Sequence, residues 1–208
     1  MRALIFSWEY PPRIVGKLAE YISTLATDLV KSNVETYIIT YHDSLTGVAE
    51  EPKGAKVTRV TNPVHSHVNL LTWVLTLNQE VERAAANVYY KTKKEISVID
   101  VYDWHFVPAA VTLKNALGIP FVFSVDSLED HRSPGSNAPL NMAIRGIEWL
   151  GFYEAAAVTA KTDWMKNEIT RIDHVPKERI IVVSPSADTW VKDIIGVYST
   201  AAGGGSKR

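Results

Sequence analysis

The sequence predicts an α/β fold: one domain with a doubly wound, mostly parallel, Rossmann-like sheet. Apolar segments rich in β-branched and aromatic residues alternate with segments of helical periodicity, which is the order of strands and crossover helices. Residues 121–125 form an apolar strand of the kind that lies in the middle of a parallel sheet. Residues 3–8 form another, which leads to Gly16 at a helix start. The length of 208 residues suits one large domain of this type.

The same patterns place each element along the chain. We expect strands at residues 3–8, 35–41, 56–60, 98–102, 121–125, 157–160 and 180–184. We expect helices at 16–31, 70–90, 107–117, 140–155 and 162–171, and a closing helix at 188–199. Polar runs predict loops at 42–54, 62–69 and 126–139. The predicted domain covers 1–200, and the glycine-rich residues 201–208 suggest a flexible tail or an expression remnant.

Composition argues against several classes of function. The net charge is -1, so we expect no surface for nucleic acid or for an anionic membrane. Cysteine is absent, which removes disulfides and thiolate metal sites. The chain begins directly with a strand, and no apolar run approaches about 18 residues. We therefore expect no signal peptide, no membrane span and a cytoplasmic location.

Residues that follow the predicted strands are the candidates for a site, because ligands of doubly wound sheets bind outside the carboxyl ends of the strands. The candidates for catalysis are Lys17, Asp100, Tyr102 and Asp126. The candidates for substrate binding are Trp8, Glu9, Gly16, Asp103, Trp104, His105, Ser127 and Lys161. We also expect the N–H groups at the start of the first helix to face an anion. His65 and His67 lack a third partner for zinc, so we predict no metal and no cofactor.

The most informative of these residues also have structural explanations. Lys17 suits a phosphate anchor or an amine nucleophile, and it equally suits a solvated lysine on a first helical turn. Asp100, Asp103 and Asp126 suit acid–base chemistry or a cation site, whereas aspartates at strand exits commonly cap helices or bond loop backbone. The tryptophans suit stacking on a sugar ring or a base, but buried aromatic packing is the commoner explanation.

Three segments together resemble the N-terminal domain of GT-B glycosyltransferases of the glycogen and starch synthase type. They are residues 6–16, Asp103-Trp104-His105 with Pro108-Ala109-Ala110, and Ile147-Glu148-Trp149 with Tyr153-Glu154-Ala155. The resemblance runs from residue 1 to about 186, and residues 190–198 are similar to the C-terminal helix that crosses back onto this domain in the family. It implies transfer of a glucosyl unit from a nucleotide sugar to a glucan, with this domain holding the acceptor.

The second domain, which holds most of the donor in that family, has no counterpart in this sequence. The resemblance therefore implies an isolated acceptor-side domain that does not complete the transfer alone. Its implied partners are a small molecule or glucan acceptor and a second chain that supplies a donor domain.

Departures from the family pattern gather at the predicted cleft. Lys17 stands where the family has a second glycine. Asp100 and Tyr102 stand in the segment where it has histidines. Asp126 stands where it has a histidine that meets the transferred sugar. Changes concentrated at one cleft favour an engineered version of the scaffold.

Two alternative functions stay open at this point. The first is a designed catalyst or small-molecule binder with Lys17 as amine nucleophile or anion anchor, served by Asp100, Tyr102 and Asp126. Trp8 or Trp104 would form a wall of that site. The second alternative is a noncatalytic glucan-binding module.

Overall fold

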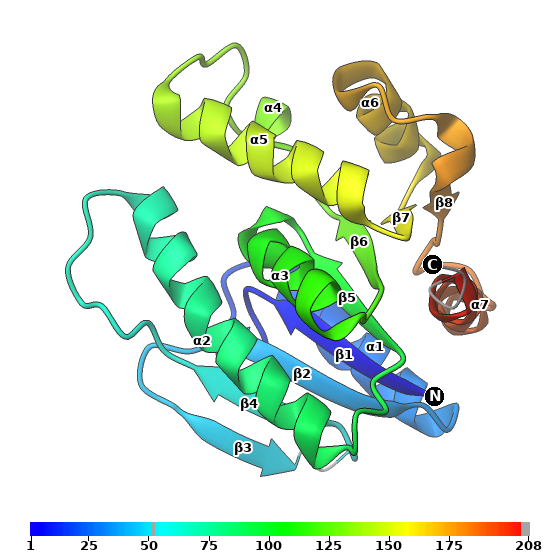
Figure 1. The fold of residues 1–208 in the computed structure, drawn as a ribbon. Helices are drawn as coiled ribbons and strands as arrows, with labels where there is room; N and C mark the ends of the chain where they lie inside the picture. Colours follow the sequence, from blue (N-terminus) through cyan, green and yellow to red (C-terminus); the bar gives the residue numbers. More distant parts are fainter. Residues whose placement is uncertain (51–52, 205–208) are drawn as a thin grey trace.

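The structure is a computed structural model that describes residues 1–50 and 53–204. These residues form one sheet of eight strands in the order β3-β4-β2-β1-β5-β6-β7-β8 (Figure 1). Neighbouring strands run parallel except β3 and β4, which are antiparallel. The strands are β1 (Arg2–Ser7), β2 (Glu35–Tyr41), β3 (Gly47–Glu50), β4 (Lys56–Val60), β5 (Val98–Tyr102), β6 (Phe121–Val125), β7 (Ala157–Ala160) and β8 (Ile180–Val182). The predicted mostly parallel, Rossmann-like α/β fold is confirmed.

Helices cover both faces of this sheet. One face carries α2 (Leu70–Lys91), α3 (Val107–Leu117), α5 (Pro139–Glu154) and α6 (Asp163–Asp173), and the other carries α1 (Leu18–Lys31) and α7 (Trp190–Gly204). Figure 1 shows α2 and α3 in front of the sheet and α1 behind it. Short helical turns occur at η1 (Trp104–Phe106), α4 (Glu129–Arg132) and η2 (Lys177–Arg179). Among the described helices, none is both long enough and apolar enough to span a bilayer.

The order of the strands reverses between β1 and β5. Strand β1 pairs with β2 on one side and with β5 on the other, so the chain winds outward to β4 and then returns to the opposite flank of β1. In doubly wound sheets this reversal opens a crevice at the carboxyl ends of the two strands. The segments that begin with Trp8 after β1 and with Asp103 after β5 therefore meet at one crevice.

Helix α5 lies close to the sheet because of a glycine. A Cβ atom at Gly151 would meet the ring of Phe123 on β6 at 2.7 Å, so a larger residue would push the helix away. The same ring packs against Phe152 at a centroid distance of 5.1 Å. This contact fixes α5, and with it the loop that precedes it, relative to the carboxyl end of β6.

A buried carboxylate ties the closing helix to the sheet. Asp100 on β5 is fully buried, and it accepts hydrogen bonds from Ser124 Oγ at 2.6 Å and from Tyr198 Oη of α7 at 2.5 Å. Ser124 Oγ lies 2.7 Å from Thr159 Oγ1 on β7. Burial raises the pKa of Asp100 to about 6, although both hydrogen bonds act in the opposite direction. Three strands and α7 thus share one polar network.

Several predicted boundaries are wrong. The predicted loop 42–54 contains β3, which pairs with β4 at the sheet edge, and its residues 51–52 lie outside the described part. The predicted loop 126–139 contains the turn α4. Helix α7 continues to Gly204, into the predicted tail 201–208, of which residues 205–208 are not described. Edge pairing stabilises β3, packing against α5 stabilises α4, and packing against α1 stabilises α7. None of these contacts leaves a strong local pattern in the sequence.

We predict that Tyr198→Phe lowers the free energy of unfolding by about 1–3 kcal/mol, because it removes a donor from a buried carboxylate. Urea unfolding followed by circular dichroism measures this loss. The matched control is Tyr153→Phe on α5, where the side chain is 65% exposed, and it should change stability by less than about 0.5 kcal/mol. Equal stability of both variants would contradict the anchoring role of the phenol.

Candidate functional site

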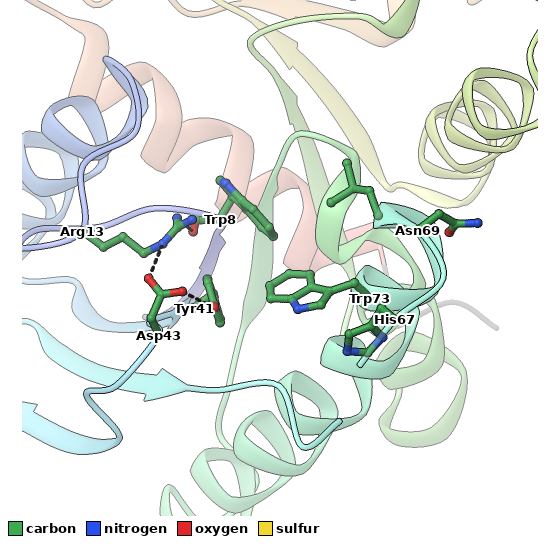
Figure 2. A pocket seen from close by; sticks show the side chains of 8 residues that line it. Trp8, Arg13, Tyr41, Asp43, His67, Asn69 and Trp73 are labelled. Atoms are coloured by element: carbon green, nitrogen blue, oxygen red, sulfur yellow. Dashed lines mark hydrogen bonds and ion pairs between the residues drawn. The ribbon is translucent and has the colours of Figure 1, made fainter. Parts of the chain in front are cut away.

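A pocket of about 400 Å³ opens at the carboxyl ends of β1 and β2 (Figure 2). Three aromatic side chains line it: Trp8 directly after β1, Tyr41 at the end of β2 and Trp73 in the first turn of α2. The other lining residues are Arg13, Asp43, His67, Asn69 and Leu70. We call this set the aromatic pocket.

The three rings hold one another in place. Trp8 stacks on Tyr41 with ring centroids 5.6 Å apart and 26° between the planes. The Trp73 ring meets Tyr41 edge-on at 4.7 Å and Trp8 at 5.3 Å. Such offset and edge-to-face pairs are the favoured geometries of aromatic rings. Figure 2 shows the rings gathered around the pocket from separate elements, so their positions depend on the packing of α2 against the sheet.

Charged groups complete one side of the aromatic pocket. The Arg13 guanidinium lies over the rings of Trp8 and Tyr41, 4.9 Å and 4.8 Å from their centroids. Its Nη1 donates to the Trp8 carbonyl at 3.0 Å, and its Nε lies 3.6 Å from Asp43 Oδ2. The Tyr41 hydroxyl donates to Asp43. Burial and this carboxylate together raise the pKa of Tyr41 to about 12, so the phenol stays protonated at neutral pH.

A helix cap holds Trp73 in position. Asn69 is the N-cap residue of α2, and its side chain accepts a hydrogen bond from the Thr72 N–H at 3.0 Å in a capping box. The Trp73 carbonyl accepts from Asn62 Nδ2 at 2.7 Å. The sequence from Asn69 to Trp73 therefore fixes both the start of the helix and the ring that faces Trp8.

His105 extends the stack under the pocket. Its ring lies between Trp8 and Trp104, 4.3 Å from each centroid and within 23° of both planes. Burial lowers the pKa of His105 to about 3, and the charges of Arg132 and Arg13 act in the same direction. The imidazole is therefore neutral at neutral pH and serves as a stacked ring.

Ring faces with nearby hydrogen-bonding groups define what this pocket can bind. Aromatic faces attract the C–H surface of another ring, and a few placed polar groups orient a ligand in a pocket. Arg13, Asn69 and His67 supply donors, while Asp43 supplies acceptors. The combination suits a ring that carries hydroxyl groups.

A second, polar group of residues lies at the ends of β6 and β7. Lys161 pairs with Asp126 and lies over the ring of Tyr21, 4.0 Å from its centroid. A small cavity of about 10 Å³, lined in part by Tyr21, Tyr102 and Lys161, lies beside them. That volume is about the minimum for one water molecule, so the cavity itself admits no larger ligand.

The model of the family described as "Glycosyl transferase 4-like domain" matches residues 18–186. The chain belongs to this family. The fold agrees, because the chain superposes on sucrose-phosphate synthase from Thermosynechococcus elongatus with a TM-score of 0.68, at 12% identity, over 96% of this chain and 98% of that chain. Against a longer structure of the same enzyme the TM-score is 0.70, over 88% of this chain and 47% of that one.

Relatives of this glycosyl transferase 4-like domain include a protein of Methanocaldococcus jannaschii called "Uncharacterized glycosyltransferase MJ1607". It is 33% identical over 196 residues, which are 93% of this chain and 48% of the relative. A glycogen synthase of Mycobacterium tuberculosis is 24% identical over 187 residues, 83% of this chain and 45% of the enzyme. The glycosyl transferase 4-like domain thus spans about half the length of the curated relatives it matches.

In this glycosyl transferase 4-like domain, Glu9 bonds the backbone just before the start of α1. Glu9 is only 4% exposed, and its Oε2 accepts hydrogen bonds from the N–H groups of Val15 and of Gly16, the latter at 2.7 Å. The chain's own carboxylate therefore occupies the N–H groups of residues 15 and 16. Glu9 and Gly16 form a self-bonded loop, and an anion at the first N–H groups of α1 itself stays a prediction.

The predicted catalytic residues do not form one cluster. The Lys17 side chain is exposed and has no hydrogen bond or ion pair with the described residues, whereas Asp126 pairs with Lys161. Asp100 and Tyr102 are buried, and Asp100 is held by Ser124 and Tyr198. A reaction that needs Lys17 facing Asp100 and Asp126 lacks its geometry here.

Three predicted substrate ligands serve the protein's own packing. Asp103 has a left-handed backbone with φ of 57°, and its Oδ1 accepts from the N–H groups of Asp126 at 2.9 Å and Ser127 at 3.1 Å. Ser127 Oγ accepts from Arg132 at 2.5 Å. Trp104 is 3% exposed and packs in a small core. These contacts fit the capping and packing explanations of such residues better than ligand binding.

Most of the aromatic pocket was not among the predicted site residues; Trp8 lines it and His105 stacks beneath Trp8. Trp73 lies on α2, and the helical spacing of its apolar residues is equally consistent with a tryptophan packed in the core. Only the tertiary structure shows that this ring lines the pocket. Tyr41 could have been predicted from the sequence as a site residue, because it is the last residue of β2 and the carboxyl end of that strand borders the crevice. His67, considered above only as half of a zinc pair, lines the pocket and contacts Trp73 at 6.2 Å.

We predict that acid weakens the fold through His105. The unfolded imidazole gains a proton near pH 6.5, whereas the folded ring stays neutral down to about pH 3, so this contribution is complete above pH 6.5 and is lost as pH falls. The free energy of unfolding should fall more steeply below pH 6.5 in the parent protein than in His105→Phe, by up to about 1.4 kcal/mol per pH unit.

Urea titrations at several pH values between 7.5 and 5 measure the difference between the two proteins. His65→Phe, the same change at an exposed histidine, is the matched control. Parallel losses of stability in the parent and His105→Phe would show that the stacked ring is not held neutral.

Proposed function

We propose that this chain is the acceptor-side domain of a glucosyltransferase of the glycogen and starch synthase type, and that the aromatic pocket binds a sugar ring of the acceptor glucan. The observation that carries this proposal is the meeting of Trp8, Tyr41 and Trp73 around a cavity of about 400 Å³ with Arg13 at its side. Stacking on an aromatic face and hydrogen bonds to charged groups are the two interactions that a pyranose ring offers.

The position of the pocket supports the same proposal. Trp8 follows β1 at the strand reversal, where ligands of doubly wound sheets bind. Similarity to a glycogen synthase supports a glucan as the acceptor. The polar groups at Asp126 and Lys161 lie farther along the same sheet edge, at the ends of β6 and β7, and they bond each other.

We propose that a complete transfer needs a second domain. The chain spans about half the length of its relatives, and in this proposal the donor nucleotide is held by a domain that corresponds to the other half of their length. A second chain is the candidate source of that domain. In this proposal the isolated domain binds acceptor and transfers nothing, and nucleic acid and membranes play no part.

The origin of the chain, its location and its alternative functions stay predictions from the sequence. The engineered origin and the cytoplasmic location rest on sequence alone. The designed catalyst with Lys17 requires that this side chain turn toward Asp126, away from the exposed position it has here. A noncatalytic glucan-binding module would use the same aromatic pocket, and it differs from our proposal only in needing no donor domain.

We predict that the domain binds maltohexaose and that Trp73→Ala weakens this binding about tenfold or more, because a stacking face is lost. Isothermal titration calorimetry measures both dissociation constants. Asp43→Ala should also weaken binding, and it perturbs packing little because the Asp43 side chain is 71% exposed. The matched control is Trp164→Ala on α6, an indole that is 60% exposed and outside the pocket.

Failure of the domain to bind maltohexaose, or equal loss of binding in Trp73→Ala and Trp164→Ala, would contradict the assignment of the pocket. A separate assay with a nucleotide glucose and maltohexaose should yield no longer glucan from the domain alone. Elongation by the domain alone would contradict the proposal that transfer needs a second domain.

A further inference from the structure

A groove separate from the aromatic pocket lies between α2 and the edge of the sheet. Its volume is about 620 Å³, within the usual range for small-molecule sites. One wall is α2 from Glu80 to Lys91, and the other is formed by Tyr37 of β2, by β4 and by residues just before and at the start of β3. The aromatic pocket uses the opposite, N-terminal end of α2, so the two cavities share a helix and no lining residue.

The floor of the groove is apolar. Val60 of β4 and Ala84 and Val88 of α2 are buried and contribute aliphatic surface. The Tyr37 ring lies at one end, with Lys56 Nζ 5.0 Å from its centroid. An apolar floor beside an aromatic ring favours a ligand with a flat or aliphatic body.

The walls are positively charged. The described lining residues include the cationic side chains of Lys56, Arg83 and Lys91 and the carboxylate of Glu80. The Arg59 guanidinium donates to the Pro11 carbonyl at 2.8 Å and is therefore not counted with them. Glu80 pairs with Arg83 at 2.6 Å, and Lys56 pairs with Glu35 at 3.0 Å. The charge of Lys91 has no ion-pair partner within residues 1–47 and 53–204. The groove therefore keeps one unpaired positive charge beside two paired ones.

Hydrogen-bond donors without partners also line the groove. The Thr58 hydroxyl, the Asn87 amide and the Lys91 ammonium all line the groove, and none of them has a hydrogen-bond partner in the described part of the chain. They come from two elements, β4 and α2, that face each other. A phosphate monoester offers the oxygens and the double negative charge that such a set of donors would bind.

We propose that the groove between α2 and the sheet edge binds a small phosphate monoester, with the phosphate at Lys91, Asn87 and Thr58 and an apolar body over Val60 and Ala84. This site lies on the flank of the fold and is independent of the acceptor function proposed for the aromatic pocket.

Calorimetric titrations with phenyl phosphate, inorganic phosphate and phenol at pH 7.5 test the two halves of this ligand. We expect saturable 1:1 binding of phenyl phosphate and binding at least about tenfold weaker for each of the other two compounds, because each lacks one set of contacts. Absence of saturable phenyl phosphate binding overturns the proposal. Binding of inorganic phosphate as tight as that of phenyl phosphate overturns the role of the apolar floor.

Variants locate the binding. Lys91→Ala should weaken phenyl phosphate binding about tenfold. Asn87→Trp should abolish it, because an exposed residue on the wall of the groove becomes bulky at little cost to the core. Lys192→Ala, which removes the same charge from α7 on the other face of the sheet, and Trp73→Ala in the aromatic pocket should leave it unchanged. Equal losses in Lys91→Ala and Lys192→Ala would overturn the assignment to this groove.

Discussion

The reversal of strand order between β1 and β5 is the constraint on which the candidate site depends. It brings the segments after two neighbouring strands to one crevice, although these segments are nearly one hundred residues apart in sequence. Trp8 enters from β1 and His105 from the turn after β5, and their rings stack at 4.3 Å. The third ring of the pocket, Trp73, lies in the first turn of α2. No single segment of the chain could build this pocket.

The carboxyl edge of the sheet divides into two chemically different halves. Over β1 and β2 the aromatic rings leave a cavity that can admit a ligand. Over β5, β6 and β7 the polar groups bond one another, through Asp100, Ser124 and Thr159 inside and through Asp126 and Lys161 at the surface. Buried polar groups that already have partners have little left to offer a ligand. This division is why binding, and not the predicted lysine chemistry, is the function that the geometry supports best.

The sequence was sufficient for the fold, and it was less informative about the site, for physical reasons. Regular alternation of strands and helices predicts the parallel sheet, but four-residue β3 depends on edge pairing with β4. Glu9 appeared as a ligand-facing residue, because nothing local reveals that its carboxylate turns back to the N–H groups of Val15 and Gly16. Trp73 belongs to the apolar stripe of α2, and this pattern does not distinguish a side chain packed in the core from one that lines a pocket. Only the tertiary packing of α2 separates these roles.

The most direct test of the central claim is a crystal structure of the domain with maltohexaose. Our account predicts a pyranose ring in van der Waals contact with the Trp73 indole, with a hydroxyl group bonded to Asp43 or Arg13. A sugar bound instead over Lys161 and Asp126, with the aromatic pocket free of carbohydrate, would contradict it.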